Sequence, residues 1–233
     1  MQLLERWLSM LLDVLAPPGC AACDTACPPQ QPFCNACGQA ACFEQAQHLD
    51  GLPLLVAARY RPPLSTAIVR FKYESRPELA AALARLVGPV LSSWELPASS
   101  ALVPVPLHPR RLVTRGYNQA ALLAQELSRS TGLLNLPRLL RRTREMERQV
   151  GKSREQRIEN ARDAFELRRP GPPNVVLVDD VITTGSTVRA CAQALTAGGV
   201  RLAAVVAVAR AESGADASPP RRGQGPAARE TAS

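Results

Sequence analysis

Apolar residues follow two different spacings along residues 54–211. Short runs without polar interruption predict strands that are buried on both faces, because a half-exposed strand would alternate with polar residues. The predicted strands are Leu55–Tyr60, Ala101–Val105, Val175–Val178 and Val200–Val208. Between these runs, apolar residues three or four positions apart predict helices.

The predicted helices are two within 61–94, one over 118–130 and one over 186–197. The second helix of the first pair is expected to begin at Pro77 and to end near Val87, before Gly88–Pro89. Asn118 is the expected cap of the next helix and Gly132 its stop. Strand, helix, glycine and strand in this order are typical of βαβ units, so the pattern predicts an α/β fold with a mostly parallel sheet flanked by helices.

The two ends of the chain have a different character. Five leucines fall on one helical face, and they are Leu4, Leu8, Leu11, Leu12 and Leu15. Residues 1–16 therefore predict a short amphipathic helix ended by Pro17, and not an export signal, since Asp13 interrupts the apolar stretch. Residues 212–233 are small and polar and predict a disordered tail. No apolar run approaches the roughly 18–20 residues of a membrane span, so we expect a cytoplasmic protein.

Composition changes this picture in one respect, the charge. Among 233 residues, 28 are basic and 20 acidic, for a formal charge of +8, and 4% are aromatic. The excess favours an anionic partner, although a solvated surface explains it as well. Almost every basic residue is Arg, with Lys only at Lys72 and Lys152, and the segment 141–162 is especially rich in Arg.

Six of the seven cysteines lie within 17–53, a segment rich in Pro and Gln that we expect to form a separate module. Two CxxC pairs, ten residues apart, are formed by Cys20, Cys23, Cys34 and Cys37. This spacing is typical of a structural four-thiolate zinc site, whereas a disulfide framework would need an oxidising compartment. Cys27 and Cys42 remain as alternative ligands. With only Phe33 and Phe43 available for base stacking, a structural role is favoured over nucleic-acid binding.

The most specific pattern is the run from Val175 to Thr187, in which the predicted strand ends in Asp179 and Asp180. After two apolar residues, a Thr-Thr-Gly-Ser-Thr turn (183–187) opens a helix. Gly185 would let the backbone approach a ligand, and the hydroxyls and N–H groups of the turn suit a phosphate. The two carboxylates suit vicinal ribose hydroxyls, directly or through hydrated Mg²⁺.

This run resembles the thirteen-residue phosphoribosyl-pyrophosphate (PRPP) signature of type I phosphoribosyltransferases. The chain through about residue 210 further resembles the ComF family, phosphoribosyltransferase-like proteins associated with competence and DNA uptake. The segments that carry this resemblance are the CxxC pairs, Phe71–Tyr73, Val103–Arg111, Arg115–Gln119, Gln149–Arg157, Asn160 and Phe165. The resemblance implies a type I phosphoribosyltransferase fold over 54–211 with an N-terminal zinc knuckle over 17–53.

Roles carried over from the resemblance divide the PRPP site into three parts. Asp179 and Asp180 would meet the ribose, with Mg²⁺, and the 5′-phosphate would bind Thr183, Thr184, Gly185, Ser186 and Thr187. The loop Pro104–Arg115 would meet the pyrophosphate through Arg110, Arg111 and Arg115, with Lys72 as a further ligand. Among these residues, Asp179, Asp180 and Arg115 are the catalytic candidates. The segment from Gln149 to Arg157 resembles the mobile loop that closes over PRPP.

Two kinds of function fit these patterns. The first is Mg²⁺-dependent transfer of ribosyl phosphate from PRPP to an acceptor that no motif identifies. The second is a non-catalytic protein that senses PRPP or a nucleotide, or that handles single-stranded DNA through phosphate contacts. The family resemblance implies a role in DNA uptake, together with other competence proteins.

Overall fold

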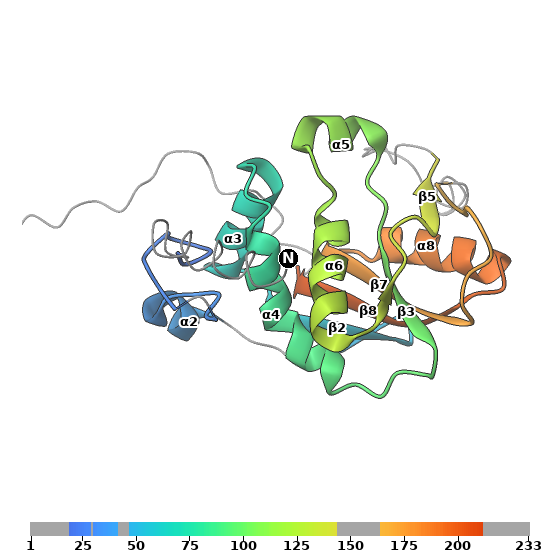
Figure 1. Ribbon diagram of the computed structural model, residues 1–233, viewed down its shortest axis with the longest axis horizontal. Coiled ribbons are helices and arrows are strands. Elements are labelled where there is room, and N and C mark those ends of the chain that lie inside the picture. Colours follow the sequence, from blue (N-terminus) through green and yellow to red (C-terminus); the bar gives the residue numbers. More distant parts are fainter. Residues whose placement is uncertain (1–18, 29, 42–46, 144–163, 212–233) are drawn as a thin grey trace, which may run out of the picture.

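The computed structural model describes residues 19–28, 30–41, 47–143 and 164–211 (Figure 1). The predicted N-terminal helix (1–16), Cys42 and Phe43, most of the Arg-rich segment, the loop Gln149–Arg157 and the predicted tail lie outside these residues. Within the described part of the chain, no helix is both long enough and apolar enough to cross a membrane.

The main sheet has six strands in the order β1-β2-β8-β7-β3-β4. Their bounds are β1 Gln47–Leu49, β2 Leu52–Arg59, β3 Ser100–Pro104, β4 Leu134–Asn135, β7 Asn174–Ile182 and β8 Arg201–Arg210. Only the β1–β2 pair is antiparallel, and the four other pairs are parallel. A separate antiparallel pair is formed by β5 Leu140–Arg142 and β6 Phe165–Leu167. The predicted open, mostly parallel sheet flanked by helices is confirmed.

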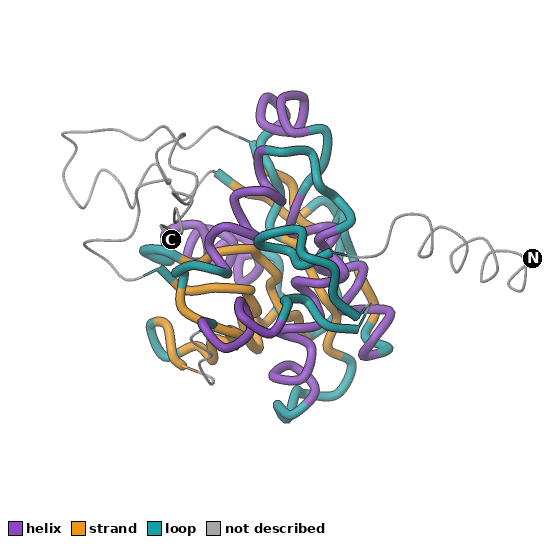
Figure 2. The backbone as a smooth tube through the Cα atoms, turned by 90° about the vertical axis from the view of Figure 1, so that its left-hand side faces the viewer, coloured by secondary structure: helices purple, strands orange, loops and turns teal. Residues whose placement is uncertain are grey.

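Helices cover both faces of this sheet, as two views show (Figures 1 and 2). The helices are α2 Asn35–Ala40, α3 Leu64–Tyr73, α4 Leu79–Ser92, α5 Pro109–Arg115, α6 Gln119–Thr131 and α8 Ser186–Ala197. On one face, α3, α4 and α6 share a core with Val176 and Val178 of β7. On the other face, α8 and the β5–β6 pair share a core with Val175 and Leu177. Alternate residues of β7 thus face opposite layers.

Strand β7 is longer than its apolar run predicts. It was expected to end in the two carboxylates, but it continues through Asp179 and Asp180 to Ile182. The extension exists because β8 pairs with β7 as far as the Ile182–Arg210 register position. Backbone pairing therefore continues where the apolar pattern stops, and the two adjacent acidic side chains are held on opposite faces of the strand.

Two helices also differ from the sequence expectation. Helix α4 does not end near Val87 but runs through Gly88–Pro89 to Ser92, because Leu83, Val87 and Leu91 form one continuous buried stripe. The polar loop after β3 contains α5, whose first turn is capped by His108, since His108 Nδ1 accepts a bond from the Arg110 N–H. Helix α5 buries none of its residues and stands away from the sheet (Figure 1). The helices at 119–131 and 186–197 agree with the prediction.

Candidate functional site

The turn between β7 and α8 has the hydroxyls and free N–H groups expected of a phosphate site. Helix α8 begins at Ser186, and Gly185 precedes it in the left-handed region with φ +75°. Thr183 and Thr184 are exposed, and Thr184 Oγ1 lies 3.3 Å from Ser186 Oγ. Arg189 Nη2 donates to the Thr184 carbonyl at 2.7 Å. The first N–H groups of α8 are thereby presented at the carboxyl edge of the sheet, where a helix N-terminus favours anions.

Gly185 is required by packing as well as by its backbone conformation. A Cβ at this position would lie 2.8 Å from Leu49 Cδ2, closer than van der Waals contact allows. Leu49 belongs to β1, and the neighbouring Asp50 pairs with Arg189 at 2.5 Å. The β1–β2 hairpin therefore lies against the turn, and the lack of a side chain at Gly185 serves both the backbone conformation and this contact.

Asp180 lies on the face of β7 that α3 covers. Its Oδ1 is 2.7 Å from Nζ of Lys72, and the two side chains are only 10% and 18% exposed. Burial alone would lower the pKa of Lys72, but the carboxylates of Asp180 and Asp179 outweigh it and raise that pKa. Lys72 is therefore charged, and it lies beside Asp180 of β7. The family resemblance implied that Lys72 is a PRPP ligand.

Asp179 lies on the opposite face, toward α8 and β5. Burial, followed by the neighbouring Asp180 charge, raises the pKa of Asp179 to about 7, against the opposing effect of Lys72. Its Oδ1 accepts a bond from the Asp180 N–H at 2.8 Å. The nearest charged and titratable groups on this face include Arg142 and the buried Cys191 thiol, whose pKa burial raises strongly. A carboxyl group whose pKa is raised this far by burial and a neighbouring charge is common at functional sites.

Two side chains around this edge, Tyr60 and Arg189, were not singled out by the sequence patterns. Tyr60, directly after β2, has its pKa raised by burial and lies near Lys72 and Asp180. Arg189 ties the phosphate turn to Asp50, 139 residues away along the chain. No local motif marks these two residues, because their partners come from distant elements.

The three arginines of the predicted pyrophosphate loop lie on α5. Arg115, at its end, donates to Gln119 Oε1 and to the Tyr73 hydroxyl, each at 3.2 Å. The Arg115 guanidinium also lies over the Tyr73 ring, 4.9 Å from its centroid. These contacts join the end of α5 to the end of α3, the helix that carries Lys72. Arg110 and Arg111 are exposed at the beginning of the same helix.

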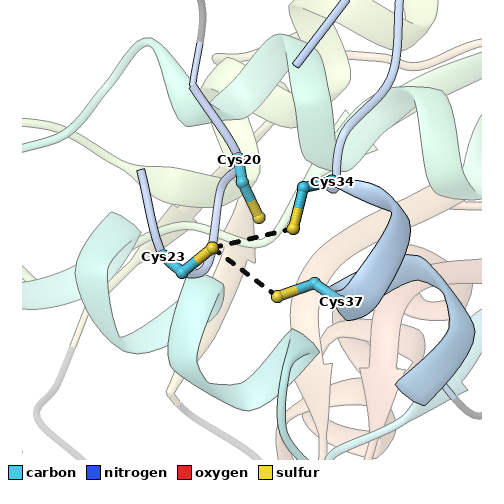
Figure 3. Close-up of side chains that lie close together, drawn as sticks. All are labelled: Cys20, Cys23, Cys34 and Cys37. Atoms are coloured by element: carbon cyan, nitrogen blue, oxygen red, sulfur yellow. Dashed lines mark hydrogen bonds between the residues drawn. The ribbon is translucent and has the colours of Figure 1, made fainter. Parts of the chain in front are cut away.

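The four cysteines of the CxxC pairs converge in the N-terminal segment (Figure 3). Their Sγ atoms, from Cys20, Cys23, Cys34 and Cys37, all lie within 4.8 Å of one another. Cys23 Sγ is 3.8 Å from the Sγ atoms of both Cys34 and Cys37. Tetrahedral zinc with Zn–S bonds of about 2.3 Å requires S–S separations of roughly 3.8 Å, so the four thiols fit a structural zinc ion.

Among the described residues of this module, Cys27 and Phe33 lie outside the thiol cluster. Cys27 is outside the group of four, with its Sγ 3.6 Å from the Gln31 carbonyl oxygen. The hydroxyl and backbone N–H of Thr25 lower the pKa of Cys23 to about 6, which supplies a thiolate at neutral pH. Phe33 is only 4% exposed and belongs to the same core as α3 and α4. It is therefore a packing residue between the knuckle and the α/β domain, and not an exposed stacking platform.

Comparison with known proteins gives relatives that match most of the chain. It is 36% identical over 197 residues to competence protein F of Haemophilus influenzae, covering 77% of this chain and 85% of that protein. It is also 36% identical over 192 residues to the DNA utilization protein YhgH of Escherichia coli K12, with the same coverage. No protein-family model matches the chain.

Among solved structures, adenine phosphoribosyltransferase of Leishmania tarentolae aligns with 72% of this chain and 95% of its own, at a TM-score of 0.38 and 12% identity. That similarity is too low to add to what the topology shows. The sequence identity to competence protein F and the YhgH proteins, sustained over three quarters of the residues, is decisive by itself. This chain belongs to the ComF family.

Proposed function

We propose that this protein binds PRPP with Mg²⁺ at the carboxyl edge of its sheet and supports the uptake or use of DNA. The observation that carries the proposal is the pairing of Lys72 with Asp180, beside Asp179 and the phosphate turn. Cationic, anionic and N–H groups converge there at the point where open α/β sheets bind ligands. The DNA-related role rests on the relatives, which are named for competence and for DNA utilization.

Each part of PRPP has a counterpart in this arrangement. The turn Thr183–Thr187 would hold the 5′-phosphate through its hydroxyls and the N–H groups of α8. Asp179 and Asp180, at the strand end before it, would accept bonds from the ribose hydroxyls. Lys72 would meet the pyrophosphate together with the α5 arginines Arg110, Arg111 and Arg115, whose planar guanidinium groups suit phosphate oxygens.

The residues present also fit a magnesium ion. Mg²⁺ prefers carboxylate and phosphate oxygens and keeps several waters, so two carboxylates beside a pyrophosphate form a suitable set. Asp180 already has Lys72 as a partner, whereas Asp179 has a pKa raised to about 7 by burial and by the Asp180 charge. A cation would reduce the repulsion between the two acids. The effect on protonation should be larger for Asp179, because Asp180 already pairs with Lys72.

Catalysis, if PRPP is a substrate, would be ribosyl-phosphate transfer with loss of pyrophosphate. The bond from C1 of the ribose to the pyrophosphate oxygen breaks, and an acceptor atom takes its place. Bound Mg²⁺ would neutralise charge on the leaving group, and Lys72 and Arg115 would hold that group. Asp179 and Asp180 would stabilise the positive charge that develops on the ribose, since charge stabilisation in a preorganised site is usually the largest catalytic contribution.

The test is a calorimetric titration of PRPP with Mg²⁺ into the parent and into Asp179→Asn/Asp180→Asn. The variant keeps the size and most hydrogen bonds of the acids but removes their charge. Loss of charge-assisted contacts worth about 1.5–3 kcal/mol each should weaken binding at least about tenfold. The melting temperature measured on the same sample shows that the fold persists. A parent that does not bind PRPP, or a folded variant that binds it equally well, would contradict the proposal.

Direct handling of single-stranded DNA is the second candidate function. Exposed arginines lie on α5 and in or next to the β5–β6 pair. Those of the second group are Arg138, Arg141, Arg168 and Arg169. Such contacts would be electrostatic, so affinity should fall steeply with salt and depend little on sequence. Neutralising Arg138, Arg168 and Arg169 together should reduce the salt slope of oligonucleotide binding. Binding that is independent of salt would exclude this mode.

A further inference from the structure

Helix α3 contacts both the cysteine knuckle and β7, the strand that carries Asp180. Cys20, Ala21 and Phe33 of the knuckle are buried in one core with Ile68 and Phe71 of α3. At its C-terminal end, the same helix carries Lys72, which pairs with Asp180 of β7. The zinc module and the candidate ligand site thus share one helix as their common neighbour.

Arg70 joins this helix to the knuckle. It is only 8% exposed, and its guanidinium group has partners on two sides. Nη1 donates to the Ala21 carbonyl at 3.2 Å, and Nη2 forms an ion pair with Asp24. Nε donates to Glu74 Oε2 at 3.3 Å within the helix itself. A buried guanidinium group is costly without such partners, so the position of α3 depends on the two that the knuckle supplies.

The turn that carries the first two metal ligands determines where Asp24 lies. Asp24 directly follows Cys23, and its N–H donates to the Cys20 carbonyl at 3.0 Å. Its φ of +59° is a conformation that non-glycine residues rarely adopt and that surrounding contacts must maintain. Arg76 donates to the same carboxylate at 3.2 Å, which adds a second contact from beyond α3.

Arg70 and Lys72 point in different directions because two positions on a helix are about 200° apart. One side chain reaches the knuckle and the other reaches Asp180. The Tyr117 hydroxyl also donates to the Phe71 carbonyl, which holds the intervening residue. A displacement of this last helical turn at the Arg70 side must therefore move the ammonium group at the Lys72 side.

We propose that Asp24 and Arg70 are positioning residues through which the metal-bound knuckle holds Lys72 in place for PRPP. This inference rests on the proposed function. Zinc at Cys20, Cys23, Cys34 and Cys37 stabilises the turn, Asp24 anchors Arg70, and the last turn of α3 keeps Lys72 at Asp180. Loss of the anchor lowers PRPP affinity without any change in the residues that touch the ligand.

Two variants separate this role from a general loss of charge. Asp24→Asn removes a carboxylate that the knuckle offers to Arg70, and Glu74→Gln removes one that α3 itself offers. Both carboxylate side chains are 55% exposed, so the two changes are matched in exposure and charge. Calorimetric titration with Mg²⁺ and PRPP should show about fivefold weaker binding for Asp24→Asn and less than twofold for Glu74→Gln, or roughly 1 kcal/mol and 0.4 kcal/mol.

Zinc content and hydrogen exchange of residues 68–76 complete the test. Asp24→Asn should keep one zinc per chain and exchange these amides faster, even without PRPP. A zinc-loaded variant with parental affinity and parental exchange overturns the inference, and so does tighter binding. If the parent does not bind PRPP, the proposed function fails, whereas the exchange comparison still tests the coupling. If Asp24→Asn loses zinc, Arg76→Gln is tested in its place, because Arg76 pairs with Asp24. We expect Arg76→Gln to bind PRPP about twofold more weakly. Parental affinity together with parental exchange in this variant would overturn the inference.

Discussion

Asp180 and Asp179 are neighbours in sequence, but they lie on opposite sides of the sheet in contrasting surroundings. Asp180 faces α3, where Lys72 neutralises it at 2.7 Å. Asp179 faces α8 and β5, where burial and the Asp180 charge raise its pKa to about 7. The difference shows that a paired-acid motif can place two carboxylates in different electrostatic surroundings, because a strand turns successive side chains to opposite faces.

The two acids would therefore have different roles at the proposed PRPP site. Asp180 and Lys72 form a preorganised ion pair whose position depends on α3 and, in our proposal, on the knuckle. Asp179 has no comparable cation at hydrogen-bond distance among its described contacts, so a bound Mg²⁺ would change its protonation most.

The largest effect is expected from Lys72→Met, which removes the cation from the Asp180 side. Both side chains of the pair are largely buried, so Asp180 is left with an uncompensated charge beside Asp179. Breaking a buried pair in this way should lower the free energy of unfolding by about 3 kcal/mol at pH 8. Urea unfolding measures the change.

The exposed pair of Arg189 with Asp50 provides the control for Lys72→Met. Its side chains are 48% and 57% exposed, and screened pairs of this kind contribute at most about 1 kcal/mol. Asp50→Asn should therefore cost much less than Lys72→Met. Equal losses of unfolding free energy in the two variants would show that the buried Lys72–Asp180 pair contributes no more to stability than the exposed Arg189–Asp50 pair.

An intermediate effect of opposite sign is expected from Asp179→Asn. The raised pKa means that the folded protein binds more protons than the unfolded chain between about pH 4 and pH 7, so parental stability falls as pH rises through this range. Asn removes that cost and can still accept the bond from the Asp180 N–H. The gain in stability at pH 8 should exceed the gain at pH 5 by about 2.5 kcal/mol.

Unfolding curves at the two pH values check this prediction. Asp180→Asn serves as the comparison, because it removes the partner of Lys72 and should destabilise the protein at pH 8. If Asp179→Asn were destabilising at both pH values, the carboxyl group would be a structural cap, and the electrostatic contrast between the two acids would be wrong.

The smallest effect concerns the pH dependence of ligand binding. A bound cation favours the charged form of Asp179, so PRPP affinity with Mg²⁺ should rise roughly fivefold from pH 6 to pH 8, with release of a proton. Calorimetry in buffers of different ionisation enthalpy measures both quantities. Because the phosphates of PRPP also titrate near pH 6, Asp179→Asn is the reference, and its pH dependence should be weaker.

Local patterns in the sequence were sufficient for the elements that depend on neighbouring residues. The helices at 119–131 and 186–197 follow from their caps and apolar stripes, and the parallel sheet follows from strands without polar alternation. The two CxxC pairs predicted a four-thiol cluster, since each short turn brings two sulfur atoms together. Patterns failed where a distant partner decides, as for β7, which β8 extends to Ile182, and for α4, whose buried stripe continues past Pro89.

The amino-acid sequence specifies the chemical groups available at the site, namely the two carboxylates, the hydroxyl-rich turn and the thiols. Which charges meet depends on the fold, because the packing of α3 against the sheet and the knuckle brings Lys72 to Asp180 and Arg70 to Asp24. Residue spacing fixes geometry within one strand or helix turn. Contacts between elements depend instead on how apolar faces are buried together, and the pKa of Asp179 follows from that burial.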